Sequence, residues 1–173
     1  FPGSTVGNFS RSDASQLLQN FASMIRDESD DEQIHSEGAV VVGFDCKKDT
    51  SRMEAAYNDA EGVTAEFNYN VIDRLAQELR VSLDREKFTF RADWVEDEGA
   101  IVSRLWVDES HTVEMAGEAV RFEAGEAIRM EESHKYTPDE FKTLAQQSGL
   151  GMERIWTDDA ADFAVAYLRP LSV

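Results

Sequence analysis

The sequence has a single cysteine, few basic residues and no long hydrophobic run. Cys46 stands alone among 173 residues, which excludes a disulfide within the chain and suits a reducing compartment such as the cytoplasm. The best apolar stretch, AVVVGF at 39–44, is far below the roughly 18 residues that a membrane-spanning helix needs. The first residues also lack the basic start and apolar run of a signal peptide. We therefore expect a soluble cytoplasmic protein.

Basic side chains are outnumbered, with 17 Lys and Arg against 35 Asp and Glu and a formal net charge of −18. This charge repels phosphate backbones and anionic lipid head groups, so we expect neither nucleic acid nor a membrane as a partner. The acidic peak DESDDE at 27–32 lacks the spacing of a calcium loop and favours a solvated loop. No Cys or second His stands at ligand spacing from His35, His111 or His134, so we expect no metal site.

The opening stretch FPGSTVGN is typical of a turn that follows a strand. Pro2 with Gly3 and Gly7 with Asn8 are turn pairs, and Ser4 and Thr5 are capping residues. No strand precedes this turn, and the first residue is not Met. We therefore expect a fragment of a longer protein whose N-terminal part is missing.

Hydrophobic periodicity predicts an α/β arrangement for the first segment. A helix is expected from Ser12 or Asp13, either of which can cap it, to about residue 27. GAVVVGFDC at 38–46 is a continuous β-branched run, typical of a strand buried on both faces of a parallel or mixed sheet. Such a strand needs neighbours and covering helices, which we expect the missing part to supply.

The middle and the end of the chain have different patterns. Two helices are expected at about 51–58 and 61–80, and an apolar stripe runs along the second: Val63, Phe67, Val71, Leu75 and Leu79. Residues 87–133 alternate with a period near two, which predicts an antiparallel α+β block. Residues 137–149 predict a helix with a Thr137 cap, Glu140 in a capping box and Gly149 as terminator, before a closing hairpin. The three tryptophans, Trp94, Trp106 and Trp156, are expected in the core.

Four separated blocks resemble a known family. They are FPGSTVGN at 1–8, AAYNDAEGVTAEFNYNV at 55–71, FEAGEAIRMEESHKYT at 122–137 and RIWTDDAADFAVAYL at 154–168. In this order they resemble the C-terminal half of the histidine-specific, S-adenosylmethionine-dependent methyltransferases, which make the Nα-trimethylhistidine of ergothioneine synthesis. The resemblance implies S-adenosylmethionine as cofactor, bound mainly by the missing N-terminal segment, and a small amino acid as substrate.

The resemblance also implies the fold class and the domains. The fold is expected to be α/β: the C-terminal part of a Rossmann-like methyltransferase sheet with an inserted α+β substrate-binding domain. Residues 1–48 would begin the methyltransferase core, 49–137 would form the substrate-binding domain, and 138–173 would add the final helix and β-hairpin of the core. The fragment alone is expected to show no methyltransferase turnover.

The resemblance implies Asn8 as the catalytic residue. It matches the asparagine of the family's FPGST-x-GN block, whose side-chain oxygen can accept a hydrogen bond from the substrate amine and aim its lone pair. The alternative is a turn asparagine that tolerates a left-handed backbone. Gly3, where the backbone must approach cofactor or substrate closely, and the adjacent Ser4 are implied to lie against the cofactor.

The substrate pocket is implied by further matches. Tyr57 matches a tyrosine that grips the main-chain end of the substrate; its alternative is a half-buried aromatic at a helix end. Glu131 and Ser133 match the family's imidazole-binding pair, and being two apart on a strand they project from one face, where an acceptor and a hydroxyl complement a neutral imidazole. On pattern alone they form an exposed polar edge strand. Ser103 stands where relatives often carry a methionine that packs on the ring, a departure that removes apolar contact.

The predicted function is therefore methylation of the α-amino group of L-histidine. One alternative keeps the fold and changes the acceptor to another amino acid or amine, such as an indolic amino acid. Another is a non-catalytic amino-acid-binding domain, which the absence of a G-x-G-type cofactor loop in the 173 residues favours. The residues Asn58, Asp59, Asn68 and Asn70 are expected to cap helices and pin the domain junction rather than bind substrate.

Overall fold

The structure is a computed structural model that describes residues 1–26 and 38–171. The chain divides into two compact units, and each is described by itself. The first unit comprises Phe1–Lys48, Glu96–Ala100 and Glu132–Val173, and the second comprises Asp49–Val95 and Ile101–Glu131. The acidic stretch 27–32 and His35 lie outside the described residues. In the described part, no helix combines the length and the apolar character that a membrane crossing requires.

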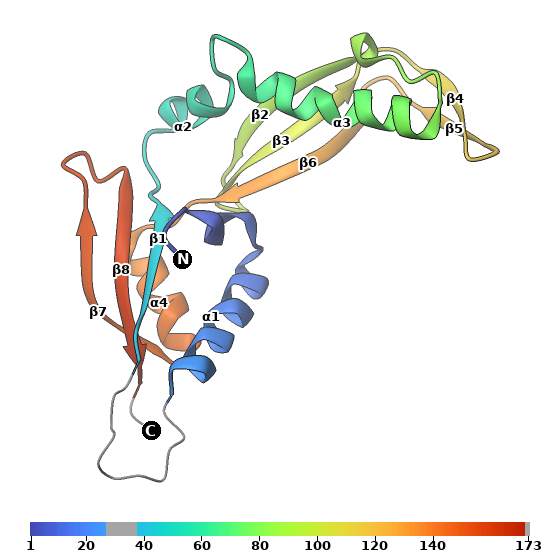
Figure 1. The fold of residues 1–173 in the computed structure, drawn as a ribbon. Coiled ribbons are helices and arrows are strands. Elements are labelled where there is room, and N and C mark those ends of the chain that lie inside the picture. The colour runs from blue at the N-terminus through green and yellow to red at the C-terminus, as the bar shows by residue number, and fades with distance from the viewer. Residues whose placement is uncertain (27–37, 172–173) are drawn as a thin grey trace. The chain divides into compact units, whose positions relative to one another are not determined.

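The first unit is built on a three-stranded antiparallel sheet in the order β1-β8-β7 (Figure 1). Its strands are β1 (Val40–Asp45), β7 (Leu150–Thr157) and β8 (Phe163–Pro170). Helices α1 (Arg11–Ile25) and α4 (Pro138–Gln147) pack on one face of this sheet, and the short 3-10 helix η1 (Thr5–Asn8) lies against β1. The core forms between the helices and the sheet, around Leu18, Phe44, Tyr136, Phe141 and Leu168, which are all fully buried. This arrangement gives the predicted helix, strand, helix and closing hairpin.

The helix ends follow from capping residues. The hydroxyl of Ser10 accepts a hydrogen bond from the Asp13 N–H, so α1 starts before the predicted caps at Ser12 or Asp13. For α4 the prediction is confirmed: Thr137 and Glu140 form a reciprocal capping box, and Pro138 occupies the first turn. Gly149, with a φ of 81°, follows the end of α4 in a left-handed conformation that glycine adopts without strain.

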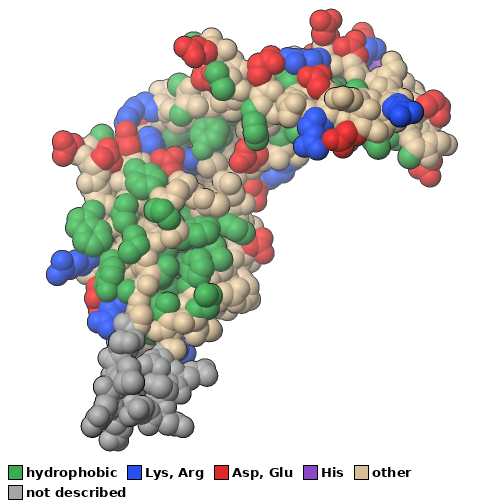
Figure 2. Space-filling view, in the orientation of Figure 1, with side chains coloured by type: hydrophobic (Ala, Val, Ile, Leu, Met, Phe, Trp, Pro, Cys, Tyr) green, Lys and Arg blue, Asp and Glu red, His purple; other side chains and the backbone are tan. Residues whose placement is uncertain are grey.

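Within the described residues, β1 is buried on one face only, and its burial on the second face by segments outside this chain stays a prediction. Val42 and Phe44 point into the core and are fully buried, whereas Val41 is 41% exposed. Both α1 and α4 cover the same face, which leaves the other face of β1 and β7 open. Trp156, expected in the core, is likewise 50% exposed on β7. Figure 2 shows hydrophobic side chains gathered over this part of the first unit.

The two edges of β1 are paired differently. Along one edge β1 is antiparallel to β8, from Val40 opposite Leu168 to Asp45 opposite Phe163. Along the other edge, the Phe1 amino group donates to the Val41 carbonyl at 2.9 Å and the Phe1 carbonyl accepts from the Gly43 N–H at 3.0 Å. This pair of bonds brackets Val42 in the pattern of parallel strands. A Cβ at Gly43 would lie 2.1 Å from the Pro2 carbonyl oxygen, so the close approach of the opening turn requires glycine there.

The second unit is an α+β block, as the change in periodicity predicted. Its strands are β2 (Phe88–Val95), β3 (Ala100–Val107) and β6 (Ala127–His134), in the order β2-β3-β6, with the β4–β5 hairpin (His111–Met115 and Glu118–Phe122). The last residues of β6 and the first of β3 belong to the first unit. Helices α2 (Thr50–Tyr57) and α3 (Val63–Leu79) pack against β2, and a one-turn 3-10 helix, η2 (Arg85–Lys87), precedes β2.

The apolar stripe of α3 does not face the core of the second unit. Ile72, with 3% exposure, and the half-buried Tyr69 and Ala76 pack against the β2 and β3 side chains. The stripe itself is exposed, with Phe67 at 69%. Helical spacing predicted the stripe correctly, but not which face of the helix the sheet covers.

Candidate functional site

Asn8 ends the short 3-10 helix η1 and is exposed. The left-handed residue of this turn is Ser4, with a φ of 59°, and Asn8 is not among the residues with positive φ. The interpretation of Asn8 as a turn asparagine with a left-handed backbone is therefore wrong. Within residues 1–26 and 38–171, its side-chain amide makes no hydrogen bond. The backbone conformation thus does not explain an asparagine here, and its amide is open to a ligand.

Gly7 brings the opening turn against the segment that follows the middle of β6. A Cβ at Gly7 would lie 2.8 Å from the His134 carbonyl oxygen and 3.5 Å from the Ser133 Oγ. A contact of 2.8 Å with backbone leaves no space for a side chain, so only glycine fits without displacing residues 133–134. Two predicted site residues, Asn8 and Ser133, are thereby held in one neighbourhood of the first unit.

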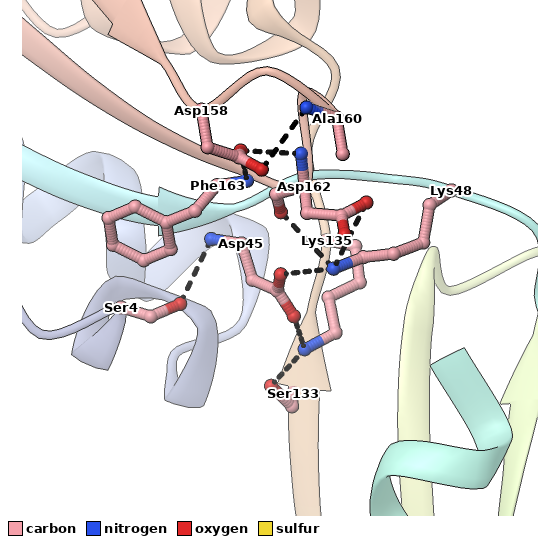
Figure 3. Close-up of polar contacts among 9 residues, drawn as sticks. All are labelled: Ser4, Asp45, Lys48, Ser133, Lys135, Asp158, Ala160, Asp162 and Phe163. Carbon is pink, nitrogen blue, oxygen red and sulfur yellow. Dashed lines mark hydrogen bonds and ion pairs between the residues drawn. The ribbon is translucent and has the colours of Figure 1, made fainter. Parts of the chain in front are cut away.

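Ser133 is buried, with 8% exposure, and its hydroxyl contacts a buried lysine. The Lys135 Nζ donates to the Ser133 Oγ at 2.9 Å and lies 2.6 Å from the Asp45 Oδ2 (Figure 3). Lys135 is 1% exposed. A buried ammonium is tolerated only when it is paired, and the carboxylate of Asp45 at the end of β1 supplies the pairing.

Asp45 connects this lysine to two other segments of the first unit. Its Oδ1 accepts a hydrogen bond from the Lys48 Nζ at 2.9 Å, and its backbone N–H donates to the Ser4 Oγ at 3.0 Å. Lys48 also donates to the Asp162 carbonyl at 3.2 Å, in the β7–β8 connection that Figure 3 shows beside it. These contacts of Ser4, Asp45, Lys48, Ser133, Lys135 and Asp162 form a polar network. The network joins the opening turn, residues 133–135 and the closing hairpin, which belong to three of the four blocks that carry the family resemblance.

The β7–β8 connection is fixed by one carboxylate. Asp158 accepts hydrogen bonds from the backbone N–H groups of Asp162 and Phe163 at 2.8 and 2.9 Å, and from Ala160 at 3.3 Å. The Phe163 N–H is the largest of the causes that lower the pKa of Asp158, because these bonds favour the ionised form. This turn holds the Asp162 carbonyl in place for Lys48.

Two protonated groups flank the network. Cys46 pairs with Tyr136 in an isolated parallel bridge, and both side chains are buried. Burial, assisted by the negative charge of Asp45, raises the pKa of the Cys46 thiol, and burial also raises the pKa of Tyr136 against the opposing effect of Arg11. Both shifts favour the protonated form of the group.

Gly3 and Ser4 have different surroundings. Gly3 is exposed, and among the described residues a Cβ there would meet Thr5 Oγ1, at 3.5 Å, and no other atom beyond its chain neighbours within 4 Å. This open backbone fits a residue against which a cofactor could lie. The Ser4 hydroxyl, in contrast, holds the Asp45 N–H. The observed use of Ser4 is structural, and its contact with a cofactor stays a prediction.

In the second unit, Tyr57 ends α2 and is half-buried against Met53, Ala92 and Ile101. This setting agrees with the alternative interpretation of Tyr57 as a half-buried aromatic at a helix end. A contact of Tyr57 with substrate stays a prediction. The neighbouring Asn58 pairs with the Ala92 backbone in both directions, donating at 2.7 Å and accepting at 3.0 Å. Asp59 accepts from the first N–H groups of α3, at Val63 and Thr64. The prediction that these two residues fix helix ends is confirmed.

Glu131 is exposed on β6, and within the described part of the chain its carboxylate makes no hydrogen bond or ion pair. Ile128 and Met130 pack in the core, so strand alternation places Glu131 on the opposite face of the sheet. On β3 the same rule places the buried Ser103 with Ile101 and Leu105, on the face that packs in the core. Alternation therefore does not place Ser103 beside Glu131, and its role in substrate binding stays a prediction.

The predicted site residues do not line the cavity beside α4 in the first unit. That cavity, of about 460 Å³, is lined by Arg11, Lys47, residues 96–99, Glu140 and other residues of α4. Its walls are mixed in charge, and Lys47 pairs with Glu140 at 2.6 Å. Across the described residues, no group of three or more His, Cys, Asp or Glu side chains could hold a metal ion.

Sequence reasoning missed Lys135 and Asp45. The signal for Lys135 was present, because it continues the alternation of Glu131 and Ser133 by two more residues. The partnership with Asp45 was not detectable, since it joins residues that lie 90 positions apart through the fold. Gly7 was recognised only as a turn residue, although its lack of a side chain is what brings the turn onto residues 133–134.

Comparisons with known proteins agree on one family. A family model described as histidine-specific methyltransferase, SAM-dependent, matches residues 1–170. A histidine N-alpha-methyltransferase of Mycolicibacterium smegmatis is 33% identical over 168 residues, which cover 96% of this chain and 50% of that protein. An ergothioneine biosynthesis protein 1 of Neurospora crassa is 30% identical over 162 residues, 90% of this chain and 17% of that protein.

A more distant relative has another name. A 4-dimethylallyltryptophan N-methyltransferase of Aspergillus fumigatus is 27% identical over 174 residues, covering 96% of this chain and 49% of that protein. The chain thus spans about half the length of the histidine and dimethylallyltryptophan N-methyltransferases that it matches.

Proposed function

Because this chain belongs to the family of SAM-dependent, histidine-specific methyltransferases, we propose that the complete protein methylates the α-amino group of L-histidine, towards Nα,Nα,Nα-trimethylhistidine. The observation that carries the proposal is the exposed Asn8 amide, which makes no hydrogen bond within the described residues and which Gly7 holds near Ser133. These residues come from two of the blocks that carry the family resemblance.

The chemistry needs a neutral amine whose lone pair is aimed at a methyl carbon. S-adenosylmethionine, when bound, supplies a methyl group on a positively charged sulfur that departs as a neutral thioether. The task of this chain is to bind and orient the acceptor, and the Asn8 side-chain oxygen suits it because it can accept a hydrogen bond from the amine N–H. Holding the amine in one orientation contributes to the rate by positioning rather than by proton transfer.

Recognition of the imidazole would rest on Glu131 and Ser133. The two lie two residues apart on β6, so alternation directs them to the same side of the strand. The carboxylate can accept from the ring N–H, and the hydroxyl can donate to the other ring nitrogen. Tyr57 would contact the main-chain end of the amino acid. Gly3 would lie against the cofactor, and the half of the family's length outside this chain would supply most of the cofactor site.

A second candidate is methylation of an indolic amino acid. It is supported by the relative that carries a dimethylallyltryptophan N-methyltransferase name, and by the small Ser103 at a position where the family often has methionine. An indole offers only an N–H donor and no acceptor nitrogen, so it would not use the Ser133 hydroxyl as a donor. We propose histidine first, because the family match covers residues 1–170.

The test is an acceptor assay with the complete protein and S-adenosylmethionine. The assay compares three kinds of acceptor at equal concentration: L-histidine, L-tryptophan and other amines that lack an imidazole ring. The methylated products are identified by mass spectrometry. We expect methylated histidine as the main product. Turnover of tryptophan without histidine would support the second candidate, and no turnover of any amino acid would support a non-catalytic binding domain.

A further inference from the structure

We propose that Arg11 is a positioning residue that fixes the Asn8 amide relative to residues 133–136. The inference rests on the proposed function, since it concerns the group that orients the acceptor amine. In the sequence, Asn8 lies between two residues that contact the end of β6 and the residues after it. Gly7 makes the first contact, and Arg11, the first residue of α1, makes the second.

Arg11 contacts two consecutive residues that follow β6. Its Nη2 donates to the Lys135 carbonyl at 2.8 Å, and its guanidinium carbon lies 3.8 Å from the centre of the Tyr136 ring. A guanidinium is planar, so it can donate hydrogen bonds at its edge while its face rests on an aromatic ring. Tyr136 is fully buried, which fixes the ring that receives the guanidinium. One side chain therefore holds both residues against the start of α1.

Gly99 confines the guanidinium further. A Cβ at Gly99 would lie 3.1 Å from the Arg11 Nη2, and the Gly99 carbonyl accepts from the Lys135 N–H at 2.9 Å. The end of the Arg11 side chain thus lies close to Gly99, Lys135 and Tyr136. Packing and hydrogen bonds from several residues hold a side chain in one rotamer, so α1 begins at a fixed place relative to these residues.

Local helix chemistry does not account for an arginine at this position. The N-terminal end of a helix carries a partial positive charge, so a cation in the first turn is unfavourable there. The Ser10 hydroxyl already caps α1, and Asp13 supplies an acidic side chain in the first turn. The contacts of Arg11 with Lys135 and Tyr136 are therefore what the arginine contributes.

The two contacts bracket Asn8. On one side is Gly7, whose close approach to His134 sets the opening turn against this segment. On the other side is Arg11, three residues after Asn8. With the Gly7 contact alone, the end of the turn would be free to rotate and to move the amide. Because positioning of the acceptor amine contributes to the rate, Arg11 acts on methyl transfer through Asn8.

The experiment is a double-mutant cycle between Arg11 and Asn8 in the complete protein, with kcat for methylation of L-histidine as the readout. Arg11→Met should lower kcat about tenfold with a smaller change in the KM for histidine, because it displaces the orienting amide rather than the ring contacts. In the Asn8→Ala background, the same substitution should lower kcat by less than about twofold, since no amide is left to misplace.

A role of Arg11 in stability alone predicts a different result. In that case Arg11→Met lowers kcat by the same factor in both backgrounds, because the two substitutions act independently. Equal factors, or an unchanged kcat in Arg11→Met, would overturn the inference. Thermal unfolding of each variant establishes that the protein is folded at the temperature of the assay.

The matched control is Lys47→Met. Lys47 lines the same cavity as Arg11 and pairs with Glu140 at 2.6 Å, so the substitution removes a cation from the same surroundings. It leaves both contacts of Arg11 in place. We expect kcat to stay within about twofold of the wild type, because a partly exposed ion pair contributes little. A fall equal to that of Arg11→Met would assign the effect to lost charge and contradict the proposal.

Arg11→Lys keeps the inference testable if Arg11→Met does not fold. An ammonium is a point charge without the planar fork, so it does not hold the carbonyl and the ring together. Arg11→Lys should lower kcat about threefold in the presence of Asn8 and leave it unchanged in Asn8→Ala; equal falls would contradict the proposal. If the wild type does not methylate histidine, the proposed function fails. If it does and the two effects multiply, only this inference fails.

Discussion

The position that a Cβ would take on Gly7 lies 2.8 Å from the carbonyl oxygen of His134. This close approach sets the opening turn, with Asn8 at its end, against the Ser133 segment. The conformation of the opening turn and the geometry of the proposed site both depend on this contact between Gly7 and residues 133–134. A side chain at position 7 would push one backbone segment away from the other.

Gly7→Ala is therefore expected to destabilise the complete protein by about 1–3 kcal/mol, the usual cost of forcing extra volume into a packed site. It should also lower kcat/KM, because Asn8 moves with the turn. Urea unfolding and steady-state kinetics measure the two effects. Gly151→Ala is the matched control, since its Cβ would meet the flexible end of the Leu171 side chain at 3.0 Å. Equal effects of the two substitutions would contradict the account.

Asn8→Ala should separate activity from stability. Asn8 is exposed and its side chain makes no hydrogen bond within the described residues, so the free energy of unfolding should change by less than about 0.5 kcal/mol. If the amide orients the acceptor amine, kcat should fall on the order of a hundredfold. The measurements are single-turnover methyl transfer and thermal unfolding. A kcat within twofold of the wild type would remove Asn8 from the catalytic site.

Asn58→Ala tests the anchoring of α2 on β2. The substitution removes both hydrogen bonds to the Ala92 backbone, and Ala92 is 1% exposed. Leaving buried backbone groups unpaired should cost about 1–3 kcal/mol. Asn70, from the same sequence block, is exposed, and its side chain makes no hydrogen bond within the described residues. Asn70→Ala should therefore be nearly neutral in the same chemical denaturation assay, and similar losses for both would refute this anchoring.

Acid should weaken the closing hairpin through Asp158. Its pKa is lowered in the folded protein because backbone N–H groups, first that of Phe163, favour the ionised carboxylate. The stability that ionisation contributes is present above the ordinary pKa of 3.8 and is lost as the pH falls through the lower folded value. The difference in unfolding free energy between wild type and Asp158→Asn should hence be constant near pH 6 and shrink below about pH 4. A difference that grows on acidification would have the wrong sign.

The local signals in the sequence predicted the elements well. The capping box of Thr137 and Glu140, the hairpin after residue 150, the bond from Asn58 to the Glu54 carbonyl and the Asp59 cap depend on neighbours in the chain, and the structure confirms them. The errors concern tertiary contacts. Trp156 on β7 is exposed rather than in the core, and β2 receives Ile72 rather than the Phe67 stripe. Periodicity describes one element and does not reveal what packs on it.

In the candidate site, too, local signals were predictable from the sequence and tertiary contacts were not. Asn8, Ser133 and Glu131 were found through motif matches, and alternation along β6 agrees with the predicted pair. The Lys135–Asp45 pair could not be predicted, because it joins the end of β1 to residues after β6. Charged residues are frequent in this sequence, with 35 acidic and 17 basic side chains, so neither Lys135 nor Asp45 stands out from the others.

The most direct test of the central claim is the KM for L-histidine of Glu131→Ala in the complete protein, with the dissociation constant of S-adenosylmethionine measured alongside. The account predicts a KM raised on the order of tenfold or more, with cofactor binding unchanged, because the carboxylate would bind the ring and not the cofactor. Glu132→Ala is the control, since alternation directs that carboxylate to the other side of the strand. An unchanged KM in Glu131→Ala would contradict the assignment of histidine as the substrate of this site.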